Sequence, residues 1–336
     1  MDALSIIGLL VLAYYFVYVV CAFVLDCNVE LALKEKFGRP VSDLKGKKVW
    51  ITGASSGIGE ELAYVLAEVG CKLILSARRI AELERVKKKC LQINKNLSDD
   101  DVEVYPLDML NFNLHKEAFQ HVIDKFGQLD ILVNNAGRSQ RAKWENIEVN
   151  VDRDMFELDV FSVLSLSRMA VKHFLQMGQG HLVVTSSIAG ILPIPLSASY
   201  CGAKHALHGY FNSLLMEHSD KNINITIVCP GPVQTNFLAE CFTDTPGEKY
   251  GIKTVVDNSK VSVERCAELM GIAIANKLNE VWIAKTPAMR LIYAQYCFPN
   301  VFPWLLRSLG PKYLMKVRDA KNASTGATIE KDSKEK

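Results

Sequence analysis

The sequence predicts an α/β fold, a doubly wound parallel sheet of about seven strands preceded by an N-terminal transmembrane helix. From residue 47 to about residue 287, short β-rich runs alternate with amphipathic helical runs. This alternation predicts parallel strands joined by crossover helices. Residues 3–25 carry no charged side chain. The chain has 336 residues, of which 49% are hydrophobic and 23% charged, and that suits one large core.

The uncharged run ALSIIGLLVLAYYFVYVVCAFVL, at residues 3–25, predicts a single-pass membrane anchor. A helix of this length spans roughly 35 Å at about 1.5 Å per residue, enough for a bilayer core. A signal peptide and a buried core helix are the alternatives. Asp2 stands where a signal peptide is basic, and bulky residues follow Ala22. By the positive-inside rule, the basic residues after the run place the following domain in the cytosol. These residues are Lys34, Lys36, Arg39 and Lys45.

Charge and cysteine content argue against two other classes of protein. The 39 basic and 37 acidic residues give a net charge of +2, without a nucleic-acid footprint. The nine cysteines form no CxxC pair, which favours buried thiols over a zinc site or a disulfide framework. We therefore expect neither nucleic acid nor a metal as a ligand.

Composition divides the chain into five expected segments. They are a membrane anchor (1–28), a linker (29–46), the doubly wound sheet domain (47–287), an apolar, interfacial extension (288–318) and a polar, disordered tail (319–336). Within the extension, residues 288–310 are apolar and aromatic, but two arginines and two prolines make them a poor membrane span. An interfacial helix pair, a lipophilic cap and ordinary core packing are the alternatives there.

A glycine-rich turn follows the first strand, KKVWIT. In TGASSGIG, Gly53, Gly57 and Gly59 lie between that strand and the amphipathic helix GEELAYVLAEVG. Missing Cβ atoms let the backbone approach a pyrophosphate, and the helix N-terminus offers free N–H groups and a positive dipole end. The spacing is GxxxGxG, not the GxGxxG of the wider dinucleotide fingerprint. A glycine turn that binds nothing is the alternative.

The second strand, CKLILS, runs into Arg78 and Arg79. An acidic residue near this position binds the ribose 2′-hydroxyl of NAD, whereas an arginine accommodates a 2′-phosphate. Arg78, backed by Arg79, therefore predicts NADP(H), and solvated arginines at a helix start are the alternative. The third strand, VEVYPL, ends at Asp108 and Met109, and the Asp108 carboxylate can accept a hydrogen bond from an adenine amino group.

The next strands end in small and polar residues that a cofactor can pack against. DILVNNAG ends in Asn135, Ala136 and Gly137, and a long helix is expected over residues 152–177. NITIVCPGPVQT ends in a rigid loop that includes Pro230, Gly231, Val233 and Thr235, near where a nicotinamide would lie. Residues 237–262 lack periodicity and predict a mobile loop that covers the substrate. A helix near residues 263–277 and the strand EVWIA complete the alternation.

Three residues between Val183 and Lys204 indicate chemistry at a C=O/CH–OH pair. Tyr200 and Lys204 are four apart, so they share one helix face. A cation there favours the ionised phenol and so predicts a lowered Tyr200 pKa, suited to proton exchange with an oxygen. Ser187, at the end of HLVVTSS, can hydrogen-bond the same oxygen. A Tyr and Lys that merely cover a helix face are the alternative.

Together these motifs resemble the short-chain dehydrogenase/reductase family, across roughly residues 47–284. TGASSGIG, NNAG, Ser187, YCGAK and PGPVQT occur in the family's order. The resemblance implies a Rossmann fold, an NADP(H)-dependent oxidoreductase of the endoplasmic reticulum membrane, and a homodimer formed through the long helices. It also implies steroids and retinoids as substrates.

The resemblance also implies a role for each matching residue. Tyr200 would be the catalytic acid/base, Lys204 would bind the nicotinamide ribose and lower the Tyr200 pKa, and Ser187 would orient the substrate oxygen. The remaining implied cofactor contacts are Gly53, Ser55, Ser56, Gly57, Ile58 and Gly59 for the pyrophosphate, Arg78 and Arg79 for the 2′-phosphate, Asp108 and Met109 for the adenine, Asn135 for its ribose, and Ala136, Gly137, Pro230, Gly231, Val233 and Thr235.

One residue departs from the family pattern. Asp159, in ELDVFSV, stands where the family usually has a catalytic asparagine whose main-chain carbonyl holds a water linked to Lys204. Aspartate keeps the carbonyl but adds a negative charge, unless it is protonated or paired. The leading hypothesis is a membrane-anchored, NADPH-dependent reductase of lipophilic ketones and aldehydes. A non-catalytic NADP(H)-binding membrane scaffold and a different reaction, such as epimerisation, are the alternatives.

Overall fold

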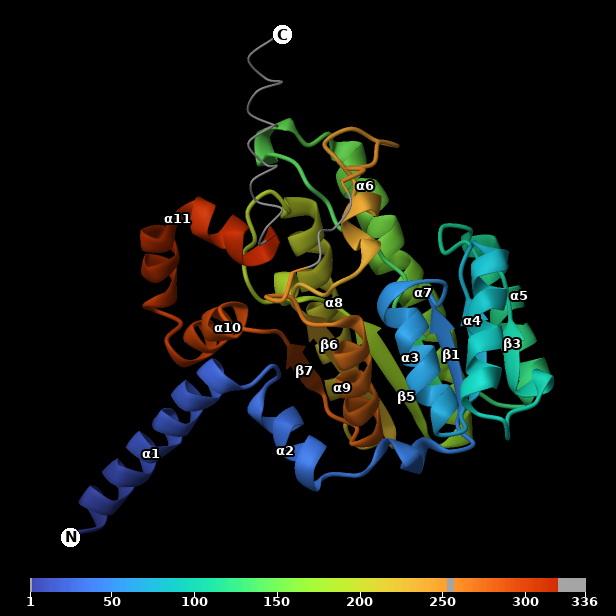
Figure 1. The fold of residues 1–336 in the computed structure, drawn as a ribbon, viewed down its shortest axis with the longest axis horizontal. Helices are drawn as coiled ribbons and strands as arrows, with labels where there is room; N and C mark the ends of the chain where they lie inside the picture. The colour runs from blue at the N-terminus through green and yellow to red at the C-terminus, as the bar shows by residue number, and fades with distance from the viewer. Residues whose placement is uncertain (1, 253–256, 320–336) are drawn as a thin grey trace.

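The computed structural model describes residues 2–252 and 257–319, and it confirms the predicted parallel sheet (Figure 1). Within these residues one sheet has seven strands: β1 (Lys48–Thr52), β2 (Lys72–Ser76), β3 (Val102–Val104), β4 (Ile131–Asn134), β5 (Gly180–Thr185), β6 (Ile223–Pro230) and β7 (Glu280–Ile283). The predicted disordered tail lies outside the described residues from residue 320 onward.

The strand order is β3-β2-β1-β4-β5-β6-β7, and every neighbouring pair is parallel. The chain starts in the middle at β1, moves outward to β3, and returns to β4 on the other side of β1. This reversal separates the loops that follow β1 and β4, and ligands of open α/β sheets bind at such a switch point. The predicted glycine-rich turn and NNAG follow these two strands.

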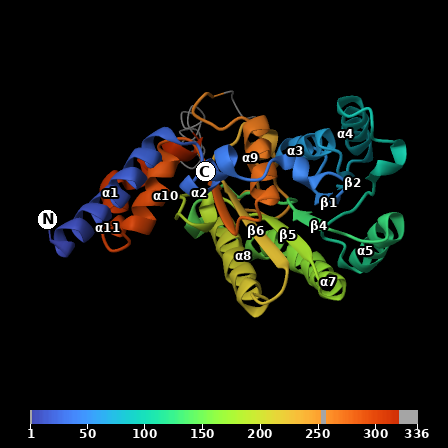
Figure 2. The same ribbon diagram turned by 90° about the horizontal axis from the view of Figure 1, so that it is seen from below.

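Helices cover both faces of the sheet (Figure 2). One face carries α3 (Gly57–Glu68), α4 (Ile80–Ile93) and α9 (Val263–Ala275), and the other carries α5 (Phe112–Phe126), α7 (Ser162–Met177) and α8 (Ala198–Glu217). Strand side chains alternate between the two cores: Val49 and Ile51 pack on the first face, and Trp50 packs on the second. Both faces are buried, which is why the strands read as nearly continuous apolar runs.

The predicted long helix over residues 152–177 is interrupted. It consists of α6 (Val149–Phe156), one π-helical turn (Glu157–Phe161) and α7. The shorter 3-10 segments are Val41–Leu44, Asp99–Asp101, Trp144–Asn146, Ile188–Gly190 and Asn236–Glu240. A π-helical turn inserts one residue into the helical ladder, and such turns are frequent at functional sites. Here the turn carries Asp159.

The N-terminal helix α1 (Ala3–Val24) projects from the domain with nearly all its side chains exposed (Figure 1). Among the described residues it is the helix long and apolar enough to cross a membrane. The expected linker is not a free spacer, because residues 29–46 contain α2 (Val29–Phe37), which packs on α9. Arg265 of α9 forms ion pairs with Asp26, at 2.9 Å, and with Glu35.

The C-terminal extension is helical. It consists of α10 (Ala288–Cys297) and α11 (Phe302–Asp319), and α11 is kinked at Gly310, before Pro311. Helix α10 packs on α1 and α11, as the left side of Figure 2 shows. The α10–α11 pair therefore lies beside α1, at the same end of the molecule (Figures 1 and 2).

We predict that Leu31→Ala lowers the free energy of unfolding by about 2–5 kcal/mol, because it leaves a cavity in the core. Leu31 of α2 is fully buried in the core that α9 shares. Unfolding in detergent, followed by circular dichroism, measures the change. Leu33→Ala, in the same helix but 53% exposed, is the matched control and should stay within about 0.5 kcal/mol of the wild type. Equal losses in both variants would contradict the docking of α2.

Candidate active site

The three predicted catalytic residues meet at the carboxyl end of β5. Ser187 follows that strand; its hydroxyl donates to the carbonyl oxygen of Pro230 (3.3 Å) and accepts from the N–H of Ala189 (3.1 Å). Tyr200 lies in the first turn of α8, close enough to Ser187 for that side chain to act on its pKa. One turn later, the Lys204 Nζ lies 5.5 Å from the centre of the Tyr200 ring. A hydroxyl, a phenol and a cation are thus grouped as carbonyl chemistry requires.

Lys204 is buried and fully engaged. Its Nζ donates to the carbonyl oxygen of Thr185 at 3.0 Å and lies 3.0 Å from the Asp159 Oδ2. The other oxygen of Asp159 accepts from the backbone N–H of Arg138 at 2.9 Å. The carboxylate that departs from the family pattern is therefore paired, and it acts as the counter-ion of Lys204.

Burial and charge act in opposite directions on these groups. Burial raises the pKa of Tyr200, and Lys204 and the Ser187 side chain lower it less, so the net shift is upward. The expectation of a lowered Tyr200 pKa is therefore wrong for this structure, because burial outweighs the cation. Burial would lower the pKa of Lys204, but Asp159 and Tyr200 together raise it above its usual value. Burial raises the pKa of Asp159, against the opposing effect of Lys204.

The glycine-rich turn has room only for glycine at two positions. A Cβ on Gly53 would lie 2.8 Å from the Ala136 Cα, and one on Gly59 would lie 2.4 Å from the Asn135 side-chain nitrogen. Gly57 has a φ of +64°, in the left-handed region, and begins α3. The turn therefore brings the N-terminus of α3 against the NNAG loop. Such a cradle fits a pyrophosphate.

Threonine side chains join the loops after β1, β4 and β5. The Thr52 Oγ1 accepts from the N–H groups of Asn135 (3.0 Å) and Ala136 (3.2 Å). The Asn135 side-chain nitrogen donates to the carbonyl oxygens of Thr52 and Gly53, and its oxygen accepts from Thr185 at 3.4 Å. Asn135 is thus fixed at the switch point, between the glycine-rich turn and the Ser187 strand.

The two arginines after β2 differ in their contacts. Arg79 donates to the hydroxyls of Ser55 (3.1 Å) and Ser56 (2.9 Å) in the glycine-rich turn. Arg78 is exposed, and its charge helps to lower the pKa of Glu240. Sequence reasoning ranked Arg78 first, but in this structure it is Arg79 that contacts the turn. Either guanidinium remains available to a phosphate at the edge of the cradle.

The remaining predicted cofactor residues differ in exposure and in the groups that they contact. Asp108 is exposed and accepts from the N–H of Leu110, whereas Met109 is buried and its carbonyl bonds to His115. The Thr235 methyl group would lie 3.3 Å from a Cβ on Gly57, so the β6 loop reaches the glycine-rich turn. A Cβ on Gly231 would lie 2.7 Å from the Ala284 Cβ. Val233 forms a bridge with Val261.

The expected substrate-covering segment, residues 237–262, is described except for residues 253–256. It begins in the 3-10 turn Asn236–Glu240, and the Phe237 ring lies 6.4 Å from that of Tyr200. Glu240 lies 3.5 Å from the Arg138 guanidinium and 2.9 Å from the Lys249 Nζ. The Glu240–Arg138 ion pair therefore links this segment to the loop after β4, and the Glu240–Lys249 pair lies within the segment. Its mobility stays a prediction.

Sequence reasoning missed Thr52, Thr185 and Arg138. The two threonines are the last residues of β1 and β5. A polar residue at the carboxyl end of a buried parallel strand is a signal that would have found both. Arg138 acts through its backbone N–H, which any residue supplies, so no signal in the residue type could have found it.

Comparison with known proteins supports the same assignment. Residues 47–246 match the family model described as short chain dehydrogenase. "Dehydrogenase/reductase SDR family member 7" of Homo sapiens is 40% identical over 292 residues, which cover 85% of this chain and 84% of that protein. The Mus musculus protein of that name is 40% identical over 297 residues, 88% of this chain and 87% of its own length. These matches confirm the resemblance that the motifs, with the GEELAY and EVWI segments, predict.

Solved structures share the fold. An alcohol dehydrogenase from the archaeon Thermococcus sibiricus, complexed with 5-hydroxy-NADP, aligns with a TM-score of 0.62 and 24% identity, covering 71% of this chain and 97% of its own. A putative short-chain alcohol dehydrogenase from Sinorhizobium meliloti 1021 aligns with a TM-score of 0.54 and 24% identity, covering 58% and 76%. At this identity the likeness shows a common fold.

We predict that Lys204→Met lowers the free energy of unfolding by about 3–5 kcal/mol at neutral pH, because it leaves the buried Asp159 carboxylate without its cation. Burial then raises the Asp159 pKa further above its value in the unfolded chain. A raised carboxyl pKa costs stability as pH rises from the unfolded pKa through the folded pKa. The deficit should therefore be smallest in acid and grow toward neutral pH, as measured by thermal unfolding across that range.

Lys204→Met combined with Asp159→Asn is the control for this prediction. It buries no charge, so most of the lost stability should return and the pH dependence should disappear. A deficit that stays the same in the double variant, or does not change with pH, would show that packing and not charge is responsible.

Proposed function

This chain belongs to the short-chain dehydrogenase family of oxidoreductases, and on that premise we propose that it reduces carbonyl groups of lipophilic molecules with NADPH. The observation that carries the proposal is the convergence of Ser187, Tyr200 and Lys204 at the carboxyl end of β5, with the Lys204 Nζ 5.5 Å from the centre of the Tyr200 ring. The family binds a nicotinamide cofactor, and the glycine cradle beside Asn135 and Ala136 fits its pyrophosphate. The reaction converts a ketone or aldehyde, NADPH and a proton into an alcohol and NADP⁺.

Tyr200 is the acid in this proposal. Burial raises its pKa, so the phenol is protonated at neutral pH and can give its proton to a carbonyl oxygen. Ser187 donates a second hydrogen bond to that oxygen. When bound, the nicotinamide supplies the hydride that the carbonyl carbon accepts. Lys204 stabilises the phenolate that results, and Asp159 and the Thr185 carbonyl hold its ammonium in place.

The preference for NADPH rests on charge at the edge of the cradle. Arg79 contacts the glycine-rich turn, and Arg78 is exposed beside it. A guanidinium can bind a phosphate in two parallel hydrogen bonds. It stands here near the position where an NAD site has an acidic residue for the ribose 2′-hydroxyl. We expect Arg79 to move from the serine hydroxyls to the 2′-phosphate. Asp108 and Met109 lie after β3, and we assign them to the adenine.

The apolar helix α1 and the apolar extension support a membrane location and lipophilic substrates, and the family resemblance supplies the substrate classes and the organelle. We propose that α1 anchors the protein in the endoplasmic reticulum membrane, with the sheet domain in the cytosol, and that substrates are compounds which partition into lipid. Steroids, retinoids and xenobiotic ketones or aldehydes are such compounds. The reverse reaction, oxidation of an alcohol, uses the same groups, and the ratio of NADPH to NADP⁺ sets the direction.

We predict that Tyr200→Phe abolishes NADPH oxidation with steroid ketones, retinal and aromatic diketones, while NADPH still binds. The phenyl ring keeps the packing but has no proton to give. Absorbance at the NADPH band measures turnover in detergent, and quenching of protein fluorescence measures binding. Wild-type protein with NADH is the cofactor control.

Binding of NADPH without turnover by the wild type would contradict the enzyme proposal and favour a scaffold. Asp159→Asn then separates two explanations. Turnover gained in Asp159→Asn would show that the carboxylate blocks the reaction. Product formed without net NADPH consumption would instead indicate a different reaction, such as epimerisation.

We predict that Arg78→Ala and Arg79→Ala each weaken NADPH binding about tenfold to a hundredfold, the loss of one hydrogen-bonded charge contact. Binding of NADH should change little, since it has no 2′-phosphate. Isothermal titration with both cofactors measures the ratio. Lys88→Ala removes an exposed cation on α4, the helix that begins just after Arg79, and is the control for a general change of charge. Equal losses for NADPH and NADH would contradict the assignment.

A further inference from the structure

The turn between α10 and α11 lies beside the middle of α1. The Arg290 guanidinium lies 4.1 Å from the Phe23 ring, near the end of α1. Further along α10, Tyr293 contacts Tyr18, and beyond its end Phe298 stacks on Tyr15, with ring centres 5.7 and 6.4 Å apart. Helix α10 thus runs back along α1, toward the N-terminus of that helix.

The packing of α10 on α1 determines how deep the turn between α10 and α11 would lie in a membrane. Tyr15 precedes Phe23 by about two helical turns, which is roughly 12 Å along the axis. All 22 residues of α1 give about 33 Å, little more than the roughly 30 Å of a hydrocarbon core. If α1 spans a bilayer, nearly its whole length lies within the hydrocarbon core. The level of Tyr15, and Phe298 with it, then lies inside the acyl-chain region.

The side chains around the turn suit that position. Tyr296 (52%), Phe298 (52%), Val301 (54%) and Trp304 (67%) are exposed. No residue between Arg290 and Arg307 is charged, and Arg290 lies level with Phe23, near the headgroup end of α1. Arginines that flank an apolar segment can reach the headgroups. A bilayer therefore fits this pattern of charge.

Most of the backbone N–H groups of the turn are paired or replaced by proline, which suits lipid, where an unpaired N–H is costly. The N–H of Phe298 donates to Ala294, and the N–H groups of Val301 and Phe302 both donate to the Phe298 carbonyl. Pro299 and Pro303 have no N–H to pair. The two prolines, which make the segment a poor span by sequence, thus remove two N–H groups from the turn, whereas the exposed Asn300 between them keeps a polar side chain and an N–H for which no hydrogen bond is found among the described residues.

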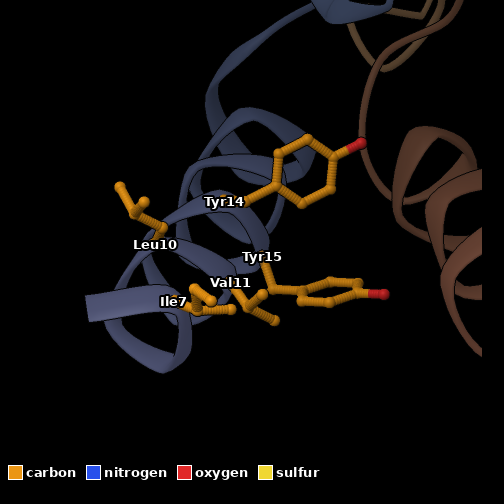
Figure 3. A pocket seen from close by; sticks show the side chains of 5 residues that line it. All are labelled: Ile7, Leu10, Val11, Tyr14 and Tyr15. Atoms are coloured by element: carbon orange, nitrogen blue, oxygen red, sulfur yellow. The ribbon is translucent and has the colours of Figure 1, made fainter. Parts of the chain in front are cut away.

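We propose that the α10–α11 hairpin, residues 288–309, is a second membrane element that enters the same leaflet as the C-terminal half of α1. Its partner is the acyl-chain region of a lipid bilayer. The inference rests on α1 being the membrane span, which is part of the proposed function. Figure 3 shows a shallow hollow on α1, lined by Ile7, Leu10, Val11, Tyr14 and Tyr15, in which the Tyr15 ring extends toward the C-terminal ribbon.

The hairpin contacts the edge strand of the sheet, at Glu280, the first residue of β7. The Tyr296 hydroxyl and the Trp282 Nε1 both donate to Glu280 of β7, at 3.1 and 2.7 Å. Beyond the kink of α11, Arg318 donates to the carbonyl of Pro195 and to the hydroxyl of Ser197, the residue before α8. Helix α11 therefore leads from the inserted turn to the helix that carries Tyr200.

The test uses the full chain in vesicles of phosphatidylcholine with brominated acyl chains, which quench tryptophan fluorescence by contact. Flotation of the vesicles first reports whether the protein is anchored. Trp304→Phe should then remove a distinct part of the quenching, and bromines on the acyl chain should quench that part more than a headgroup quencher does. Trp144→Phe is the matched control, since Trp144 is 78% exposed on the short turn Trp144–Asn146, away from α1.

Each outcome has one meaning. Flotation with quenching that depends on Trp304 and not on Trp144 supports the hairpin insertion. Flotation with the same quenching in wild type and Trp304→Phe overturns the insertion and leaves the anchor intact, provided that a thermal unfolding transition shows both proteins to be folded. Failure to float overturns the anchor, and the hairpin with it. A Trp304-dependent change in the mass of the detergent complex, without quenching, would overturn the insertion in favour of a contact with a second copy.

Discussion

The active site depends on one buried cation. Lys204 is only 4% exposed, so little water can hydrate its charge, and the fold supplies a carbonyl from the end of β5 and a carboxylate from the π-helical turn. Desolvating an ammonium costs several kcal/mol, and only a well-placed counter-ion compensates for it. These contacts fix the position of α8 relative to β5. Tyr200 and Ser187, which those elements carry, are fixed as a result.

The surrounding backbone is shaped to admit the counter-ion. The extra residue of the π-helical turn, Glu157–Phe161, accompanies an Asp159 side chain that points inward, and Arg138 donates a backbone hydrogen bond to it. A Cβ on Gly137 would lie 3.0 Å from the Asp159 Oδ2, so glycine leaves the space that the carboxylate occupies. NNAG therefore serves two purposes. Asn135 joins the loops that follow β1, β4 and β5, and Gly137 leaves room for the Asp159–Lys204 ion pair.

Much of the fold and the site could be predicted because both follow from local patterns. Alternating β-rich and amphipathic runs determine a parallel sheet, and the motifs lie at strand ends that such a sheet brings together. Three features depend on contacts distant in sequence and could not be predicted. The docking of α2 needs α9, the pairing of Asp159 needs Lys204, and the net Tyr200 pKa depends on how deeply α8 is buried. In each case the residue type allowed more than one outcome.

The edge of the sheet at β7 joins α1 to the domain that carries the candidate active site. An exposed edge strand is a liability that proteins cover, and β7 is covered by the chain that leaves α1. Asn28 donates its N–H to the Trp282 carbonyl, and the Ala284 N–H donates to Asp26, so residues 26–28 pair with β7. The helix axis is thus joined to the sheet without a free spacer. Because α10 leaves the same strand, α1 and the hairpin are positioned by one edge, and if α1 spans a bilayer as proposed, the fold sets the height of Tyr200 above it.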